Sequence, residues 1–189
     1  EGIRHAACQG VPIKINTVLL AAEGQWRSRW QEIAGFAKEY PIDVRFIEMM
    51  PIGYGKKYET VGNGELFQEI KAHYPKITRD ERIHGSGPAV YYRIPGFKGS
   101  LGFISPIHGK FCSSCNRVRL TARGYLKTCL CYHDGADLLP LMRSGLEEEE
   151  KRRQITLRME NEIFRKPSAH CFESPEEMSE EKNMFLIGG

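Results

Sequence analysis

The chain has no run of about 18 or more apolar residues, which excludes a membrane-spanning helix. It also lacks the basic and then apolar N-terminal layout of a secretory signal. No Met stands at position 1, so we expect the sequence to be either a fragment or a processed product. What is present is a core-forming composition: 189 residues, 41% hydrophobic and 27% charged, unlike that of a disordered tail.

Acidic residues are missing from a long internal block. Residues 82–133 hold eight of the 27 Lys and Arg residues and no Asp or Glu, whereas the rest of the chain has 19 basic residues against 24 acids. A positive block inside an otherwise near-neutral protein favours an anionic ligand.

The six cysteines are unevenly spread. Cys112, Cys115, Cys129 and Cys131 follow a C-x2-C-x13-C-x-C pattern, while Cys8 and Cys171 stand apart. Without a secretory signal, clustered thiols favour a metal or iron–sulfur site over disulfides. Four ligands would suit a closed structural zinc, and three would suit a four-iron cluster with one open iron. Spacing does not choose between the two, and four buried thiols without metal are a third alternative.

The first half of the chain alternates strands and helices. Residues 1–10 resemble a helix end, residues 11–20 alternate as a strand, residues 23–40 carry a helical apolar stripe, and residues 43–50 form a second strand. This strand–helix–strand order predicts a parallel βαβ unit. Lys14 and Asn16 fall on one face of the first strand, which faces either solvent or the lumen of a barrel.

The second half loses that rhythm. We predict a helix from about residue 63 to 73, two paired strands at 88–94 and 100–105, a cysteine-rich loop segment at 106–135, and helices at 137–145 and 147–165. In the last helix Ile155, Met159 and Ile163 should face inward. A domain boundary near residue 75 divides the chain into parts 1–75 and 76–189.

Arg117 and Arg119 follow the first two clustered cysteines directly. Side chains at i and i+2 of an extended segment point the same way, and paired guanidinium groups suit a phosphate or a purine edge. The alternative is an ion-paired surface, but no acid lies nearby in the sequence. Nucleic-acid binding is a weaker interpretation, because eight basic residues over 52, broken by Pro and Gly, are sparse for such a surface.

The motifs as a set resemble one enzyme family. They are Phe111-Cys-Ser-Ser-Cys115-Asn-Arg-Val-Arg-Leu120-Thr121, Gly124-Tyr-Leu-Lys-Thr-Cys129-Leu130, Pro12-Ile-Lys14-Ile-Asn16, Arg45-Phe-Ile-Glu48-Met-Met50-Pro51, Ser105-Pro106, Lys166-Pro167 with His170, and Ile187-Gly188-Gly189. Together they resemble the C-terminal half of the MoaA family, the radical S-adenosylmethionine (SAM) GTP 3′,8-cyclases of molybdenum cofactor biosynthesis.

This resemblance implies an α/β fold: the C-terminal part of an incomplete (β/α)6 TIM-type barrel in residues 1–75, then a cysteine-rich iron–sulfur and substrate-binding segment in 76–189. Cys112, Cys115 and Cys129 would hold an auxiliary [4Fe-4S] cluster whose free iron contacts the guanine of GTP. Arg117 and Arg119 would contact GTP, and Lys14 would bind its phosphates. Met50 and Arg45 would contact SAM. The tail residues Gly188 and Gly189 would reach the active site and, with the two arginines, would be catalytic.

In the family, SAM is cleaved at a first cluster, the radical takes hydrogen from the ribose C3′ of GTP, and C3′ attacks C8 to give (8S)-3′,8-cyclo-7,8-dihydroguanosine 5′-triphosphate. The C-x3-C-x2-C motif of that first [4Fe-4S] cluster is absent here, since Cys8 alone precedes Cys112. We therefore expect this chain to be inactive by itself and to need the N-terminal half of the barrel as a partner.

Three alternatives stay open at this point. One is a zinc-binding structural or interaction module that also uses Cys131, one is a non-catalytic remnant, and one is a radical-family protein with a different substrate. Cys131 is otherwise a small core residue. We expect a cytoplasmic protein with GTP as its ligand and without nucleic acid or membrane as partner, and homodimer formation is left open.

Overall fold

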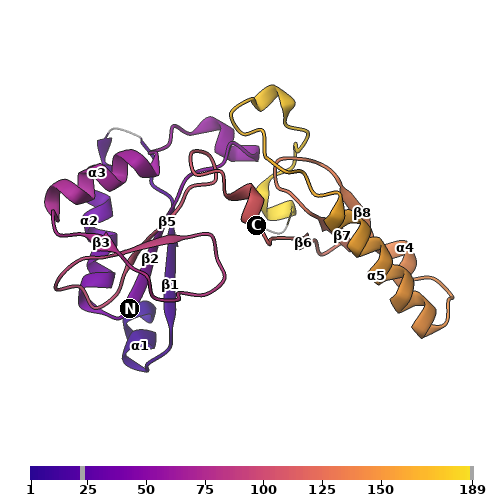
Figure 1. The fold of residues 1–189 in the computed structure, drawn as a ribbon, viewed down its shortest axis with the longest axis horizontal. Coiled ribbons are helices and arrows are strands. Elements are labelled where there is room, and N and C mark those ends of the chain that lie inside the picture. Colours follow the sequence, from indigo (N-terminus) through magenta and orange to yellow (C-terminus); the bar gives the residue numbers. More distant parts are fainter. Residues whose placement is uncertain (22–23, 188–189) are drawn as a thin grey trace. The chain divides into compact units, whose positions relative to one another are not determined.

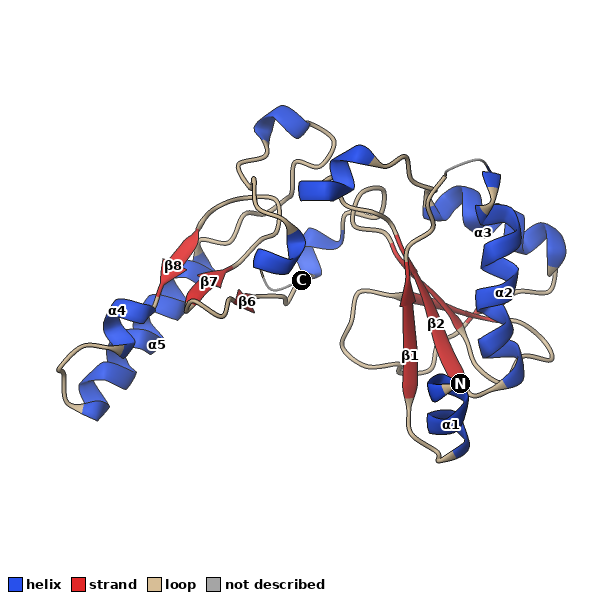
Figure 2. Ribbon diagram, turned by 180° about the vertical axis from the view of Figure 1, so that it is seen from behind, coloured by secondary structure: helices blue, strands red, loops and turns tan. Residues whose placement is uncertain are grey.

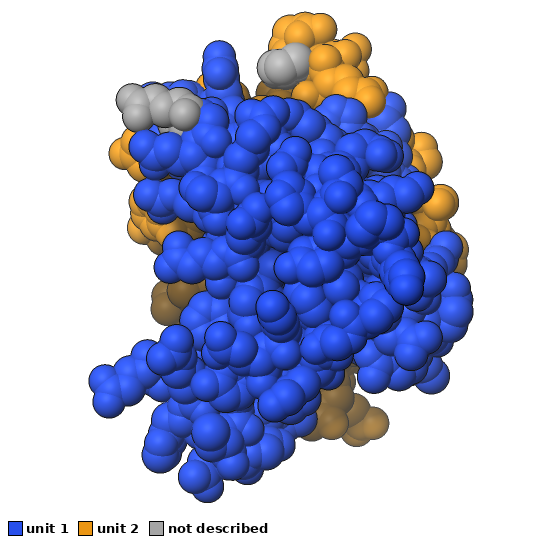
Figure 3. Space-filling view, turned by 90° about the vertical axis from the view of Figure 1, so that its left-hand side faces the viewer, with its two compact units in different colours: residues 1–50, 57–111 blue, residues 51–56, 112–189 orange. Residues whose placement is uncertain are grey.

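The computed structural model describes residues 1–21 and 24–187, and it divides the chain into two compact units. Unit 1 comprises Glu1–Met50 and Lys57–Phe111, and unit 2 comprises Pro51–Lys56 and Cys112–Gly189 (Figure 3). The main border between these compact units lies at residues 111 and 112, because a strand after residue 100 returns to the sheet of the first half.

Unit 1 is built on a mixed five-stranded sheet in the order β1-β2-β5-β4-β3 (Figures 1 and 2). Parallel pairing joins β1 to β2 and β2 to β5, whereas β4 runs antiparallel to both β5 and β3. The elements of this unit are α1 (Gly2–Cys8), β1 (Ile13–Thr17), α2 (Trp26–Glu39), β2 (Ile42–Ile47), α3 (Asn63–His73), β3 (Thr78–Arg79), β4 (Val90–Arg93) and β5 (Leu101–Ile104).

Helices α2 and α3 cover one face of this sheet (Figure 2). Alternation along each strand sends its apolar residues to that face, where Val44 and Phe46 of β2 meet Leu101 of β5 and Trp30 of α2. Trp26 and Trp30 are only 3% and 0% exposed, as the predicted helical stripe requires. The other face of the sheet receives the polar residues of the same strands, Lys14 and Asn16 among them.

The predicted α/β class, the parallel βαβ unit and the antiparallel pairing of the strands near 88–94 and 100–105 are confirmed. An incomplete barrel stays a prediction, since the described sheet is a mixed one.

Unit 2 contains a small antiparallel sheet in the order β6-β7-β8 and one long helix. Its strands and helices are β6 (Arg119–Leu120), β7 (Tyr125–Lys127), β8 (Gly135–Asp137), α4 (Leu139–Met142) and α5 (Glu148–Phe164). Short 3₁₀ turns lie at Gly53–Lys57, Phe111–Ser114, Pro175–Glu177 and Met184–Leu186; the first two cross the border with unit 1.

Helix α5 packs on this sheet with only part of its predicted face. Ile155 and Met159 contact the buried cluster of Leu126, Ala136 and Leu138, as expected. The prediction for Ile163 is wrong, because this residue is 43% exposed, and the buried residue at this end of α5 is its neighbour Glu162. None of the helices in residues 1–21 and 24–187 is long and apolar enough to cross a membrane.

Candidate functional site

The three predicted cysteine ligands all lie in unit 2, as free and half-buried thiols. Cys112 is part of the 3₁₀ turn at Phe111–Ser114, and the N–H of Cys115 donates to the carbonyl of Cys112 at 3.1 Å. Cys129 follows β7 by two residues. The short turn after residue 110 therefore brings the C-x2-C pair together as the spacing indicates.

Lysine and arginine side chains surround Cys115. The Nζ of Lys166 donates to the Sγ of Cys115 at 3.2 Å and to the carbonyls of Cys115 and Arg117, each at 2.9 Å. Lys166 stands just after the end of α5, 51 residues from Cys115. The resemblance marked Lys166 only as part of a tail motif, so its contact with the cysteines is a finding of the tertiary structure.

These groups lower the pKa of the Cys115 thiol. Burial raises that pKa, but a backbone hydrogen bond from Arg117, the hydrogen bond and charge of Lys166, and the charge of Arg119 outweigh it. The half-buried Arg119 shows the same coupling: burial lowers its pKa, and the charges of Cys115 and Cys129 act in the opposite direction. The arrangement favours the thiolate, the form of cysteine that binds metals.

The three predicted cysteine ligands have the right chemistry for a metal centre, but their side chains are not arranged as one. Among residues 1–21 and 24–187, no three His, Cys, Asp or Glu side chains are close enough together to hold a metal ion. Three accessible thiols, at least one with a lowered pKa, are nevertheless the residues that an iron–sulfur cluster requires. The side chains have to rotate or shift toward one another on binding, as in sites that form with their metal.

Cys131 has different surroundings. It is fully buried, its Sγ lies 2.7 Å from the Sγ of Cys171, and the Cys171 N–H donates to it at 3.2 Å. Burial, reinforced by Cys171, raises the pKa of Cys131 to about 12. A thiol that holds its proton is a poor zinc or iron ligand, so this environment favours a core role for Cys131.

The predicted residues of unit 1 lie on the polar face of its sheet. The strand registers align Asn16 of β1, Arg45 of β2, Gly102 of β5 and Tyr91 of β4 in one row. Within this row the Nε of Arg45 donates to the Oδ1 of Asn16 at 2.7 Å, and the buried Tyr91 makes a hydrogen bond with Arg45. Burial raises the pKa of Tyr91 despite the nearby charge of Arg45.

Gly102 makes the close approach of its neighbours possible. A Cβ at this position would lie 2.8 Å from the Tyr91 ring and 3.1 Å from the Cγ of Arg45. Both side chains therefore lean over β5 where it carries no side chain. Lys14 occupies the adjacent row, opposite Asp43 in register, while Met50 lies half-buried beyond the end of β2.

Sequence analysis missed a second layer on this face. His84 and Tyr91 lie beside Lys14, and Asp43 and Asp80 contact the ring of His84; these residues come from β2, a loop after β3, and β4. Alternation along β2 gives the face on which Asp43 lies, but its place opposite Lys14 depends on the strand register, and nothing local indicates that His84 returns to the sheet. Of the predicted tail residues, Gly188 and Gly189 lie outside the described part of the chain.

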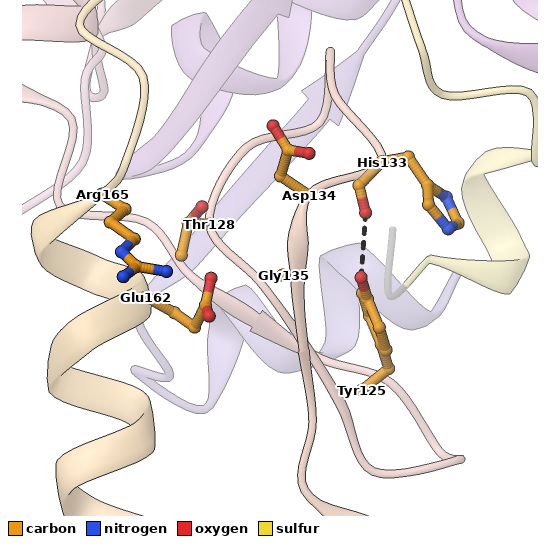
Figure 4. A pocket seen from close by; sticks show the side chains of 7 residues that line it. All are labelled: Tyr125, Thr128, His133, Asp134, Gly135, Glu162 and Arg165. Atoms are coloured by element: carbon orange, nitrogen blue, oxygen red, sulfur yellow. Dashed lines mark hydrogen bonds between the residues drawn. The ribbon is translucent and has the colours of Figure 1, made fainter.

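Unit 2 also has a polar pocket that contains none of the predicted site residues (Figure 4). Its volume is about 390 Å³, and the Tyr125 hydroxyl donates across it to the His133 carbonyl at 3.0 Å. The lining residues are Tyr125, Thr128, His133, Asp134, Gly135, Glu162 and Arg165.

Comparison with known proteins agrees with the resemblance. The family model "Molybdenum Cofactor Synthesis C" matches residues 42–172. The GTP 3′,8-cyclase of Clostridium perfringens (strain 13 / Type A) is 40% identical over 179 residues, which cover 95% of this chain and 54% of the relative. The GTP 3′,8-cyclase of Alkaliphilus metalliredigens (strain QYMF) is 37% identical over 193 residues, covering 100% and 56%. The chain thus spans about half the length of the curated relatives it matches.

Proposed function

Because the chain belongs to the molybdenum cofactor synthesis C family, we propose that it is part of a GTP 3′,8-cyclase. The reaction is the conversion of GTP to (8S)-3′,8-cyclo-7,8-dihydroguanosine 5′-triphosphate by radical SAM chemistry. Relatives named GTP 3′,8-cyclase, at 37–40% identity, support the proposal.

One structural observation carries most weight: the Cys115 thiol is in contact with Lys166 and near Arg119, which favours its thiolate. We propose that Cys112, Cys115 and Cys129 bind an auxiliary [4Fe-4S] cluster. Such a cluster, held by three cysteines, supplies an iron without a protein ligand, which can bind the guanine of the substrate. Lys166 holds the Cys115 end of the turn, through the carbonyls of Cys115 and Arg117 as well as the sulfur.

The arginines act on the substrate. Arg119 is half-buried and its charge faces Cys115 and Cys129, so it binds a group that lies beside these cysteines. Arg117 is exposed, and a guanidinium there hydrogen-bonds purine or phosphate oxygens. With Gly188 and Gly189, these arginines form the proposed catalytic set.

Unit 1 supplies further binding groups. Lys14 offers an ammonium to the phosphates of GTP. Arg45, held by Asn16, and Met50, half-buried after β2, contact SAM. We propose that this unit is the C-terminal part of an incomplete barrel, and that the motif for the first cluster lies in a segment that the present sequence does not include.

The proposal is tested first by metal content. The protein is purified without oxygen, and its iron, acid-labile sulfide and zinc are measured together with a visible spectrum. We expect about four irons with matching sulfide per auxiliary site. Cys129→Ser should lose this iron, whereas Cys131→Ser and Cys8→Ser, the matched controls, should keep it. One zinc without iron, lost on Cys131→Ser, would show that the site is a zinc module.

GTP binding tests the substrate assignment separately. Arg119→Ala should weaken GTP binding by about tenfold or more, the effect of losing one charge-assisted hydrogen bond. Arg123→Ala, which removes an exposed arginine four residues away, should leave binding unchanged. Equal affinities for the two variants would contradict a substrate role for Arg119.

A further inference from the structure

We propose that His84 is a positioning residue that keeps the ammonium of Lys14 available for a phosphate group. This inference rests on the proposed function, in which Lys14 binds the phosphates of GTP. The Nζ of Lys14 donates a hydrogen bond to the backbone carbonyl of His84, which lies 70 residues further along the chain. The loop that carries His84 therefore determines where the ammonium points.

The ring of His84 lies between two carboxylates. Its Nδ1 is 2.8 Å from the Oδ2 of Asp43, and its Nε2 is 3.1 Å from the Oδ2 of Asp80. The His84 side chain is 10% exposed and that of Asp80 is 1% exposed. Each ring nitrogen of His84 is thus within hydrogen-bonding distance of a carboxylate oxygen, and this double contact fastens the loop to the sheet.

Asp80 is itself held firmly. Arg82 donates to both of its carboxylate oxygens, with the Nη2–Oδ2 contact at 2.6 Å, and the hydroxyl of Ser100 donates to it at 2.8 Å. Its own N–H donates to the carbonyl of Tyr91 at 2.8 Å. The anchor for His84 is thus tied to both β4 and the start of β5.

Tyr91 completes the support. Its ring stacks on the His84 ring with a centroid distance of 3.9 Å and an interplanar angle of 12°, and the Nζ of Lys14 lies 6.0 Å from the Tyr91 centroid. Gly85 continues the loop with φ +104°, in the region that favours glycine, and a Cβ there would lie 3.3 Å from the Lys14 Nζ. The backbone beside the ammonium is therefore shaped to leave it space.

The positions of Lys14 and Asp43 explain why such a device is needed. They are register partners on adjacent parallel strands and lie on the same face, so an aspartate carboxylate is within reach of the ammonium. The ring of His84 contacts the Oδ2 of Asp43, and the backbone carbonyl of His84 accepts the hydrogen bond from Lys14, so Lys14 has a neutral partner. A phosphate displaces a carbonyl more readily than it displaces a carboxylate, because charge-assisted pairs are the stronger ones.

The test compares binding of GTP and of guanosine, which has no phosphate, to the oxygen-free, reconstituted protein. His84→Ala should weaken GTP binding about tenfold, the size of one charge-assisted hydrogen bond, and leave guanosine binding unchanged. It should have no further effect when Lys14→Ala is already present. Adding Asp43→Asn to His84→Ala removes the competing carboxylate and should restore part of the GTP affinity.

Two controls separate the possible results. His5→Ala changes an exposed histidine of α1 and should not affect either ligand. His84→Gln keeps an amide donor and should bind GTP with intermediate affinity, which keeps the test valid if His84→Ala does not fold. An equal loss for GTP and guanosine, or a His84→Ala effect that persists in full without Lys14, would overturn the inference. If Lys14→Ala itself leaves GTP binding unchanged, the phosphate role in the proposed function is wrong as well.

Discussion

Glu48 is the buried carboxylate that joins three parts of unit 1, and we expect Glu48→Gln to destabilise this unit strongly. Its side chain is 2% exposed and follows directly after β2. Its Oε1 accepts the Asn63 N–H at 3.1 Å and lies 2.9 Å from the Nδ1 of His108. Its Oε2 accepts the N–H groups of Ile107 and His108 at 3.1 and 3.2 Å.

These bonds have a structural purpose. The N-cap of α3 is Gly62, which has no capping side chain, so Glu48 takes that role from a distance by accepting the N–H of the first helical residue. The other oxygen holds the loop that leads toward Cys112. One carboxylate thus fixes the start of a helix and the approach to the cysteine segment.

The size of the effect follows from the number of donors. A glutamine replaces one acceptor oxygen by an NH2 group, so either the N–H groups of Ile107 and His108 or the N–H of Asn63 loses its partner, depending on which way the amide points. Each bond to a charged acceptor is worth about 1.5–3 kcal/mol. The side chain of His108 is 71% exposed, so part of the loop can turn to water instead. We therefore expect a loss of about 3 kcal/mol in the free energy of unfolding, where the ranges for one and for two such bonds meet.

Urea unfolding followed by tryptophan fluorescence measures this loss, because both tryptophans of the chain, Trp26 and Trp30, are buried in unit 1. With a denaturant slope of about 2 kcal/mol/M, the midpoint should fall by about 1.5 M. Glu32→Gln, on the exposed surface of α2, is the matched control. A midpoint for Glu48→Gln within about 0.3 M of this control would refute the reasoning.

Three other substitutions have defined outcomes. Glu180→Gln leaves Lys127 buried without its ion-pair partner, so unit 2 should lose about 3–5 kcal/mol of stability; unchanged protease resistance of this unit would contradict the prediction. The hydrogen bond from Arg82, supported by the other donors, outweighs the effect of burial and holds the pKa of Asp80 well below its usual range. Asp80 therefore stabilises the fold above its unfolded pKa of about 3.9, and this contribution is lost progressively as the pH falls below that value. The stability difference between wild type and Asp80→Asn should therefore shrink between pH 5 and pH 3 in urea titrations, and a constant difference would argue against it. Gly102→Ala forces the Tyr91 ring aside and should cost about 1–3 kcal/mol, read from the same fluorescence midpoints, whereas a neutral result would mean that the ring moves freely.

Much of the local structure could be predicted from the sequence. The apolar stripe of Trp26 and Trp30 indicated α2, and alternation placed Lys14 and Asn16 on one face of β1, both as the structure has them. Ile163 departs from the same kind of rule, because successive steps of four residues drift around a helix of 3.6 residues per turn, so the buried face that holds Ile155 continues at Glu162, seven residues on. The C-x2-C turn at Cys112 and Cys115 was likewise visible, since the spacing itself creates it.

The sequence by itself therefore determined the βαβ unit, the family and the identity of the three candidate thiols, because periodicity and motif spacing act over a few residues. The prediction of a loop segment at 106–135 was wrong, since β6 and β7 lie within it, and these strands are too short to show a periodic pattern. Tertiary structure alone decided which distant groups meet. His84 reaches Asp43 across 41 residues, and Lys166 reaches Cys115 across 51. Both contacts depend on which strands pair, in what register, and on how the loop after β3 and the end of α5 fold back. No local pattern encodes those choices, because they are settled by the burial of the whole core and by the pairing of charges that the finished sheet brings together.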